Sequence, residues 1–306
     1  MPDTSNGQLA FVKETVPGTT PATPVFNVID ITGEDLAMGA TQIRSAAVTP
    51  QRVVRSSRRA SSEVGGGFNF ELYKGAEIDT LLASLLGNAF TGSPLTAKAG
   101  GQVVDTYTLE RKISATDYRR FTGCRIGSME FTVSPEAFVG VRVGVMGYSM
   151  VTANTIVTGA TYTEATGSVE KLTSLDISAI TLSNGLTATL DYETLSFTVN
   201  NQLAIRRRLG PNSVRGVGVG QALVTGTMRA YVDKAFADAF VAETEFDMDV
   251  PFVNGGAGYT ALFKDVHITG YSDPNTGNGD EYMSNIEFEA TLDPAFASSF
   301  GFSKTS

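Results

Sequence analysis

Alternation of apolar and polar residues is the dominant pattern along the chain, and it predicts β-strands. Residues 68–72, 129–133, 195–199 and 286–289 each place an aromatic or aliphatic side chain at every second position. A period of two puts those side chains on one face of a sheet and the polar ones on the other. We therefore expect a mainly β chain whose sheets each bury one face and leave the other in water.

The polar side chains of these strands are expected to share the solvated face. They are Asn69, Glu71, Glu130, Thr132, Ser196, Thr198, Glu287 and Glu289. Half of this set is glutamate and none of it is basic, so the face is expected to be acidic on balance.

Two other segments follow the period of a helix. Apolar residues recur at i, i+3, i+4, i+7 and i+8 within 78–86 and within 232–240, which draws one stripe along a helix. The first helix is expected to end at Gly87, a natural stop. The side chains expected to be buried against the sheets are Ile78, Leu81, Leu82, Leu85, Leu86 and Val232, Ala235, Phe236, Ala239, Phe240.

The order of strands, helix and strands occurs twice, which indicates an internal repeat. Three pairs of segments match in order: 29–32 with 175–178, 78–86 with 232–240, and 141–145 with 286–290. We interpret the chain as two tandem domains, residues 1–150 and 173–306, joined by a linker or hairpin excursion at residues 151–172.

Length and composition agree with that organisation. A chain of 306 residues is long for one core, and 42% hydrophobic with 18% charged residues is typical of a globular protein. Cys124 is the single cysteine, which rules out an internal disulfide framework and a multi-thiolate metal site. The start, MPDTSNG, lacks the basic and apolar parts of a signal peptide, and no run approaches 18 apolar residues, so we expect a soluble, unexported chain.

Two arginine clusters stand out in a chain whose formal net charge is −9. They are Arg55, Arg58, Arg59 and Arg206, Arg207, Arg208. Each cluster follows a predicted strand and precedes a glycine-rich run, as on a long hairpin loop that glycines 65–67 would let swing. Arginine can bind phosphate, but no aromatic residue interleaves for base stacking. Because arginine is also favoured in ion pairs between subunits, we favour loops that reach a neighbour's carboxylates over a nucleic-acid contact.

Candidate catalytic and ligand-binding motifs do not combine into a site. His267, the only histidine, alternates with aliphatic residues as in a strand, and no orienting carboxylate or oxyanion site can be assigned to it. The glycines of 216–220 resemble a dinucleotide loop, but strand-like residues follow where a helix is needed. Residues 273–281 are oxygen-rich, but the spacing is wrong for a calcium loop and suits a turn. Cys124 is expected to be an inert buried thiol, and we expect no enzyme, cofactor or metal.

The arrangement resembles the tail tube proteins of long-tailed bacteriophages, in the group with two tandem tube domains in one chain. The resemblance covers most of the chain and rests on KETVPGTTP (13–21), IDITGEDL (29–36), the arginine loop, GGGFNFEL (65–72) and EIDTLLASLLG (77–87). It implies two β-sandwich or split-barrel domains, each with one flanking α-helix. Their sheets would join those of neighbouring domains in a ring-shaped barrel.

The resemblance also implies a function. The chain would be a structural protein of the virion tail, assembled in the host cytoplasm as trimeric, pseudo-hexameric rings stacked into a hollow tube. Double-stranded DNA would pass through the tube during genome ejection without specific binding, along a channel that the eight polar residues face. Since an acidic wall repels the DNA backbone, the genome would slide rather than stick.

Partners and alternatives follow from the same resemblance. Besides further copies of the chain, the tape measure, tail tip and terminator proteins are the expected partners, with no membrane contact. The two-domain group suggests a non-contractile, siphovirus tail. The alternatives are a tail terminator or baseplate ring protein that shares the tube fold, and an adhesin built of tandem β-domains.

Overall fold

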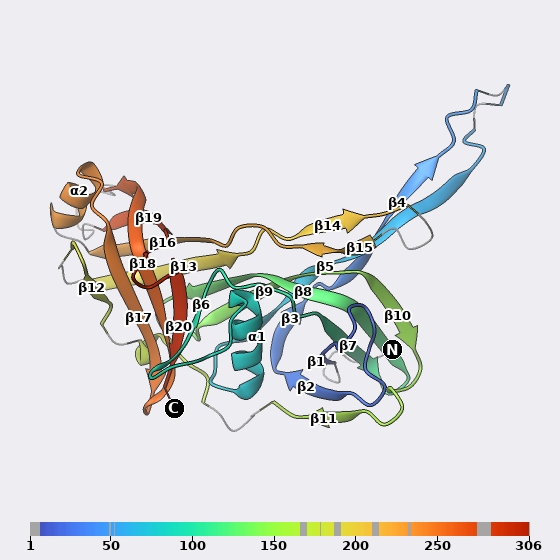
Figure 1. Ribbon diagram of the computed structural model, residues 1–306, viewed down its shortest axis with the longest axis horizontal. Helices are drawn as coiled ribbons and strands as arrows, with labels where there is room; N and C mark the ends of the chain where they lie inside the picture. The colour runs from blue at the N-terminus through green and yellow to red at the C-terminus, as the bar shows by residue number, and fades with distance from the viewer. Residues whose placement is uncertain are drawn as a thin grey trace.

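The computed structural model describes residues 7–48, 50–51, 53–165, 170–177, 179–186, 191–209, 214–231, 234–273 and 283–305. Within these ranges the chain is mainly β, with an α-helix in each half, α1 (Ala76–Leu86) and α2 (Lys234–Val241) (Figure 1). The mainly β fold predicted from the alternation is confirmed. We call β1 to β10 with α1 the first half and β12 to β20 with α2 the second half.

The strands of the first half are β1 (Gln8–Lys13), β2 (Val25–Ile29), β3 (Ile31–Glu34), β4 (Ala37–Arg44), β5 (Ser57–Glu71), β6 (Leu95–Lys98), β7 (Tyr107–Ser114), β8 (Asp117–Val133), β9 (Gly140–Gly147) and β10 (Ser149–Ala153). A connecting strand, β11 (Thr161–Thr163), and a 3-10 turn, η2 (Ser174–Asp176), follow. The strands of the second half are β12 (Thr181–Ser183), β13 (Asp191–Asn200), β14 (Ala204–Arg207), β15 (Val214–Gly218), β16 (Leu223–Tyr231), β17 (Phe246–Asn254), β18 (Ala257–Ser272), β19 (Ser284–Ala290) and β20 (Phe300–Lys304).

One continuous sheet runs through both halves. In it β5 pairs with β9, β9 with β8, β8 with β13, β13 with β16, β16 with β19, and β19 with β18, all antiparallel. The pairing of β8 with β13, in which Phe131 lies opposite Phe197, is the junction between the halves. Strands β3 and β4 both pair with β5 at the outer end of the first half.

The long strands β8 and β18 each also belong to a second layer. The beginning of β8 pairs with β7 and β10, and β7 continues through β1 and β2 to β11. The beginning of β18 pairs with β17 and β20, and β17 continues to β12. Each half is therefore a sandwich whose layers share one bent strand, a β-sandwich architecture as predicted.

Aromatic side chains fill the space between the layers. Phe131 and Phe197 stack across the junction with their ring centroids 4.7 Å apart, and Phe197 meets Phe263 edge to face at 5.0 Å. Such pairs add to the burial of the rings themselves. The two halves therefore share one apolar core across the junction.

The helical stripes are confirmed for α1 and only partly for α2. Ile78, Leu81, Leu82, Leu85 and Leu86 are all buried, and α1 ends at Gly87, whose φ of 71° lies in the left-handed region that glycine tolerates. In α2, Phe236 and Ala239 are buried and Ala235 packs at the edge of the core. Phe240 was expected to be buried and is not: it is 38% exposed, and its ring stacks on Tyr271, which packs only at the edge of the core. Val232 lies outside the described residues.

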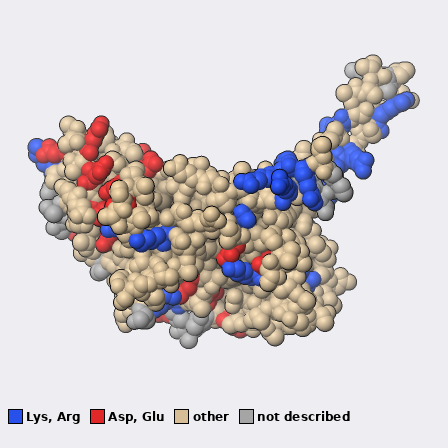
Figure 2. Space-filling view, in the orientation of Figure 1, with Lys and Arg blue, Asp and Glu red and all other residues tan. Residues whose placement is uncertain are grey.

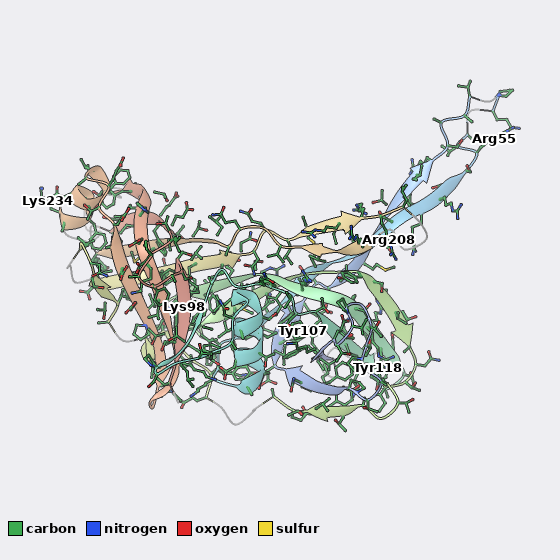
Figure 3. The ribbon with its side chains drawn as sticks, in the orientation of Figure 1. Arg55, Lys98, Tyr107, Tyr118, Arg208 and Lys234 are labelled. Atoms are coloured by element: carbon green, nitrogen blue, oxygen red, sulfur yellow. The ribbon has the colours of Figure 1, made fainter. Side chains whose placement is uncertain are left out.

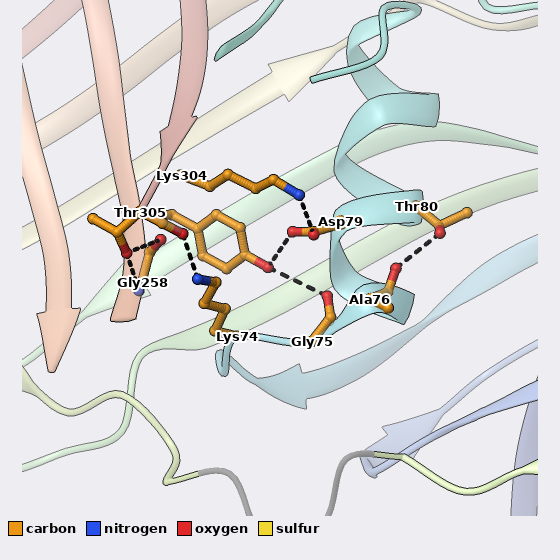
Figure 4. A network of polar contacts seen from close by, with 9 residues as sticks. Lys74, Gly75, Ala76, Asp79, Thr80, Gly258, Lys304 and Thr305 are labelled. Carbon is orange, nitrogen blue, oxygen red and sulfur yellow. Dashed lines mark hydrogen bonds and ion pairs between the residues drawn. The ribbon is translucent and has the colours of Figure 1, made fainter. Parts of the chain in front are cut away.

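A polar contact fixes α1 to the second half. Tyr259 of β18 donates its hydroxyl to Asp79 of α1 at 2.8 Å, and Lys304 of β20 donates to the other oxygen of the same carboxylate at 2.6 Å (Figure 4). The Lys74 ammonium donates to the carbonyl of Thr305. Strand β6 of the first half also pairs with β20. These contacts join the halves at a second place besides the β8–β13 junction.

The strand pairings and element order support two of the three pairs of segments on which the predicted internal repeat rests. Strands β9 and β19, which contain residues 141–145 and 286–290, hold the same place between β5 and β8 and between β16 and β18. The helices α1 and α2 follow β5 and β16. The match of 29–32 with 175–178 is wrong, because the first segment spans β2 and β3 and the second begins in η2.

Two hairpins project from the sheet. The first arm, residues 37–66, consists of β4 with the outer part of β5 and extends far from the body (Figure 1). The second arm, residues 204–218, is the shorter β14–β15 hairpin, which lies beside the base of the first. The glycines at 65–67 are not a swinging hinge as expected: they pair with β9 inside the sheet, and a Cβ at Gly67 would lie 2.1 Å from the Val143 carbonyl oxygen.

Candidate functional site

The predicted polar residues lie in two rows that cross seven strands. Residues directly opposite in an antiparallel ladder point to the same face, so the pairings define each row. One row holds Asn69, Arg142, Glu130, Thr198, Thr225, Glu289 and His267. The next row holds Glu71, Gly140, Thr132, Ser196, Thr227, Glu287 and Gly270. The structure therefore brings all eight predicted residues together on what we call the polar face.

The alternating neighbours of these residues point into the core. Phe70, Phe131, Phe197 and Phe288 are each at most 2% exposed. Because a one-residue slip of register would exchange the two faces, this burial fixes which side chains are solvated. Part of the polar face is hollowed by a depression of about 570 Å³ between Glu130, Thr198 and Glu287.

The polar face also contains an arginine that the sequence prediction missed. Arg142 of β9 donates to Asp35 at 2.8 Å and to Asn69 at 3.1 Å. The hydrogen bond from Arg142 is the largest of the causes that lower the pKa of Asp35 below its ordinary value of 3.8. The alternation in residues 141–145 already placed Arg142 at a polar position, so the signal was present in the sequence. Four glutamates against one arginine leave the two rows acidic.

The two arms carry the predicted arginines. Arg58 and Arg59 lie in β5 itself, Arg55 precedes it, Arg206 and Arg207 lie in β14, and Arg208 follows β14. All six side chains are exposed. Lysine and arginine gather along this projecting end of the molecule, where Arg55 and Arg208 are labelled (Figures 2 and 3).

The arginines differ in their partners. Arg207 forms an ion pair of 2.6 Å with Glu63 of the first arm, so this arginine is paired within its own chain. In the described part of the chain no carboxylate pairs with Arg55, Arg58 or Arg59. At the base of the arms, Arg59 lines an open pocket of about 380 Å³ together with Arg208 and Arg215, and no carboxylate is among its lining residues. This pocket attracts anions.

Carboxylates gather at the opposite end, near α2, β18 and β19 (Figure 2). Asp247 is buried and accepts hydrogen bonds from Lys264 at 2.9 Å and from the backbone of Asp265 at 3.2 Å. Burial, followed by repulsion from Asp293, Glu245 and Asp247, raises the pKa of the Asp265 carboxyl. The molecule is therefore basic along its arms and acidic at its far end.

Three of the four candidate chemical motifs lie in described parts of the fold. His267 lies in β18 as predicted and contacts Glu245 at 3.3 Å. Cys124 is buried and unpaired, and burial raises the pKa of its thiol. The glycines at 216 and 218 lie in β15 and a strand, not a helix, comes next. Of the loop at 273–281, all but Asp273 lies outside the described residues.

Among the residues that the structure describes, no three histidines, cysteines or carboxylates are placed to hold a metal ion. No described helix is long and apolar enough to cross a membrane.

Comparison with known proteins gives two findings. The ribosomal RNA small subunit methyltransferase H of Nocardioides sp. (strain ATCC BAA-499 / JS614) is 34% identical over 67 residues, which is 21% of this chain and 21% of that protein. The chain thus spans about a fifth of that relative, too little to transfer a fold or an activity. The profile of the phage tail tube protein family matches residues 4–292, nearly the whole chain. The chain therefore belongs to the phage tail tube protein family, a family of structural proteins of the virion tail.

Proposed function

We propose that this chain builds the wall of a phage tail tube by pairing its open sheet edges with those of further copies. In each copy, residues 1–150 and 173–306 act as two tube domains, with residues 151–172 as the connection. Three copies close a pseudo-hexameric ring, and rings stack into a hollow tube. The observation that carries the proposal is the β8–β13 junction.

The junction supplies a template for the contact between copies. Strand β13 pairs with β16 in the way that β3 pairs with β5: Phe197 lies opposite Gly226, and Glu34 lies opposite Phe68. In the same way β8 and β18 each pair with the following strand, β9 or β19. Strand β8 uses its other edge to bind β13, whereas among the described strands nothing pairs with the corresponding edge of β18 at residues 267–272.

The matching open edge is β3, which in the described part of the chain pairs with β5 alone. We propose that residues 267–272 of one copy pair with β3 of the next, as β8 pairs with β13. Open edges otherwise invite uncontrolled association, and a closed ring removes them. Because the two contacting surfaces differ, the contact is head to tail, the kind that generates rings.

The polar face then lines the channel. Asn69, Glu71, Glu130, Thr132, Ser196, Thr198, Glu287 and Glu289 would face the passing DNA. Arg142, the one arginine in the two rows, is paired with Asp35, so the acidic wall offers DNA little positive charge to replace its counterions. Double-stranded DNA would therefore slide during genome ejection without specific binding. The buried face of the same sheet would point away from the channel.

The arginine arms are the proposed assembly contacts, and the absence of all six arginines from the two rows of the polar face supports this role. Arg55, Arg58, Arg59, Arg206, Arg207 and Arg208 lie on the two hairpins that project from the sheet (Figure 1). Contacts of the arms with nucleic acid form the alternative. The wider context that we propose is a non-contractile tail, assembled in the host cytoplasm with tape measure, tail tip and terminator proteins.

Negative-stain electron microscopy of the purified chain, concentrated stepwise, tests this function. Hollow tubes of stacked rings are the expected result. Single rings that never stack would favour the terminator or baseplate role, and a chain that stays monomeric at high concentration would contradict ring assembly.

A further inference from the structure

The β8–β13 junction also places the second arm on the first half. Arg125 of β8 donates a hydrogen bond from its Nη1 to the carbonyl oxygen of Val217 in β15, at 2.8 Å. A Cβ added at Gly216 would lie 3.5 Å from the hydroxyl of Tyr148, which follows β9. Two positions of the first half, 125 and 148, thus support the base of the second arm.

The ladders give the equivalent of Arg125 in the second half. Ile126 of β8 and Val266 of β18 lie opposite equivalent residues of β9 and β19. The residues that precede them, Arg125 and Asp265, therefore hold equivalent positions. A base in the first half is replaced by an acid in the second.

The equivalent of Tyr148 is also an acid. The residues of β9 and β19 at this level are Val145 and Ala290, which lie opposite Ile126 and Val266. Three residues further along the chain stand Tyr148 and Asp293. The surface that corresponds to the seat of the second arm is thus formed by Asp265 and Asp293.

Matching residues through the ladders also identifies the first-arm residues that would lie on the surface formed by Asp265 and Asp293. Phe68 of β5 and Gly226 of β16 are equivalent through their partners in β9 and β19. Nine residues earlier along the chain stand Arg59, still in β5, and Val217, which lies in β15 before the connection to β16; Arg58 corresponds to Gly216 in turn.

Pairing within each arm gives the same equivalence by a second count, along the partner strands. Glu34 and Phe197 are equivalent through their partners in β5 and β16. Eight residues beyond them lie Gln42 and Ile205, which are opposite Arg59 and Val217 respectively. Two separate counts therefore place Arg59 where Val217 lies in the internal junction.

We propose that the first arm of one copy lies on the second half of the neighbouring copy in the ring, with Arg59 paired to Asp265 and Arg58 paired to Asp293. The proposal rests on the head-to-tail ring proposed above and names the surface that receives the arm. The occupant of the acidic surface is a second copy of this chain. The contact is lateral, within one ring.

Charge supports the match on both sides. The two arms contain nine arginines and one glutamate, so the rest of the chain holds 14 basic and 31 acidic residues. Arg59 lines the pocket that has three arginines and no carboxylate. On the receiving side Asp265 lies among Glu245, Asp247 and Asp293, and repulsion from them contributes to its raised pKa. A guanidinium from a neighbour relieves that repulsion, as complementary potentials at an interface do.

Disulfide cross-linking between two singly substituted chains tests the contact directly. An Arg59→Cys chain is mixed with an Asp265→Cys chain under mild oxidation; Cys124 can stay because it is buried. A covalent dimer in the mixture is expected, and neither chain alone should give it. The matched control replaces Asp265→Cys by Asp238→Cys on the exposed face of α2, which should give no dimer. A mixture that cross-links no better than this control would overturn the proposal.

Charge reversal separates this contact from ring assembly itself. Arg58→Glu with Arg59→Glu should raise the concentration needed for assembly by about tenfold or more, and so should Asp265→Arg with Asp293→Arg. A chain with all four reversals should recover most of the loss, which misfolded variants would not. Tubes that form normally from either double variant would refute this pairing and leave the tube function intact, whereas a wild-type chain without rings or tubes would refute both.

Discussion

Residue by residue, the strongest constraints fall on positions where two strands or a strand and a ring approach closely. Gly67 has no room for a Cβ beside Val143, and a Cβ at Gly226 would lie 2.3 Å from the Phe288 ring. Gly65, two residues away, has nothing within 4 Å of such an atom. Close packing therefore requires a glycine at position 67, whereas position 65 has room for a side chain.

Alanine substitutions should separate these two glycines. Gly67→Ala should lower the free energy of unfolding by about 1–3 kcal/mol, because the new methyl overpacks the β5–β9 ladder. Gly65→Ala is the matched control and should change it by much less. Urea denaturation of both variants measures the difference, and equal midpoints would contradict the packing described for Gly67.

The buried stripe of α1 gives a second residue-scale test. Leu82 is 1% exposed, so Leu82→Ala should cost about 2–5 kcal/mol through lost burial and the cavity that remains. Val241 of α2 is 83% exposed, and Val241→Ala should leave the stability of the monomer nearly unchanged. If Leu82→Ala unfolded at the wild-type urea concentration, α1 would not pack as described.

For the junction strands and the arms, the sequence predicts the local structure but not what each element pairs with. Alternation identifies which residues of β8 and β13 share a face, because the period of two is local. It does not say that these two strands pair, since that depends on contacts between residues about 65 positions apart, such as Phe131 and Phe197. The arginine clusters signalled hairpins, but the pairing of Arg207 with Glu63 follows from how the two arms lie together.

Removal of the outer arm should spare the fold. The described residues between Arg44 and Ser57 lie beyond the paired part of β4 and β5, and those of the first arm are mostly exposed. Replacing residues 45–56 by an Asn-Gly turn should leave the melting temperature within a few degrees of wild type, because no core contact is lost. Differential scanning calorimetry checks this, and a collapse of the transition would show that the arm contributes to folding.

The contact of α1 with β18 and β20 predicts a pH dependence. Burial, together with the charge of Asp79, raises the pKa of Tyr259 above the ordinary 10.0. The unfolded chain then loses this proton at a lower pH than the folded one. The contribution of Tyr259 to the free energy of unfolding is therefore fully present below about pH 10 and is lost as the pH rises further. The melting temperature of Tyr259→Phe should fall less steeply between about pH 9 and pH 11 than that of the wild type. If the melting temperatures of the two proteins fell in parallel with pH, the raised pKa of Tyr259 would be contradicted.

As a whole molecule, the chain is basic along its arms and acidic near α2 (Figure 2), and in the proposed ring these two ends of neighbouring copies would meet. The sequence predicts an internal repeat and an acidic polar face, because both follow from local patterns: the order of strands and helix, and the alternation of apolar and polar residues. It does not predict that the halves already pair through β8 and β13, that β6 crosses to β20, or that Asp265 lies among Glu245, Asp247 and Asp293. These features come from long-range strand pairing.

A cryo-electron microscopy reconstruction of assembled tubes, at a resolution that traces strands, tests the central claim most directly. We expect three chains in each ring, residues 267–272 paired with β3 of the next copy, and Glu71 and Glu130 facing the channel. A reconstruction with those glutamates on the outer wall, or with the open edges of β18 and β3 unpaired between copies, would contradict it.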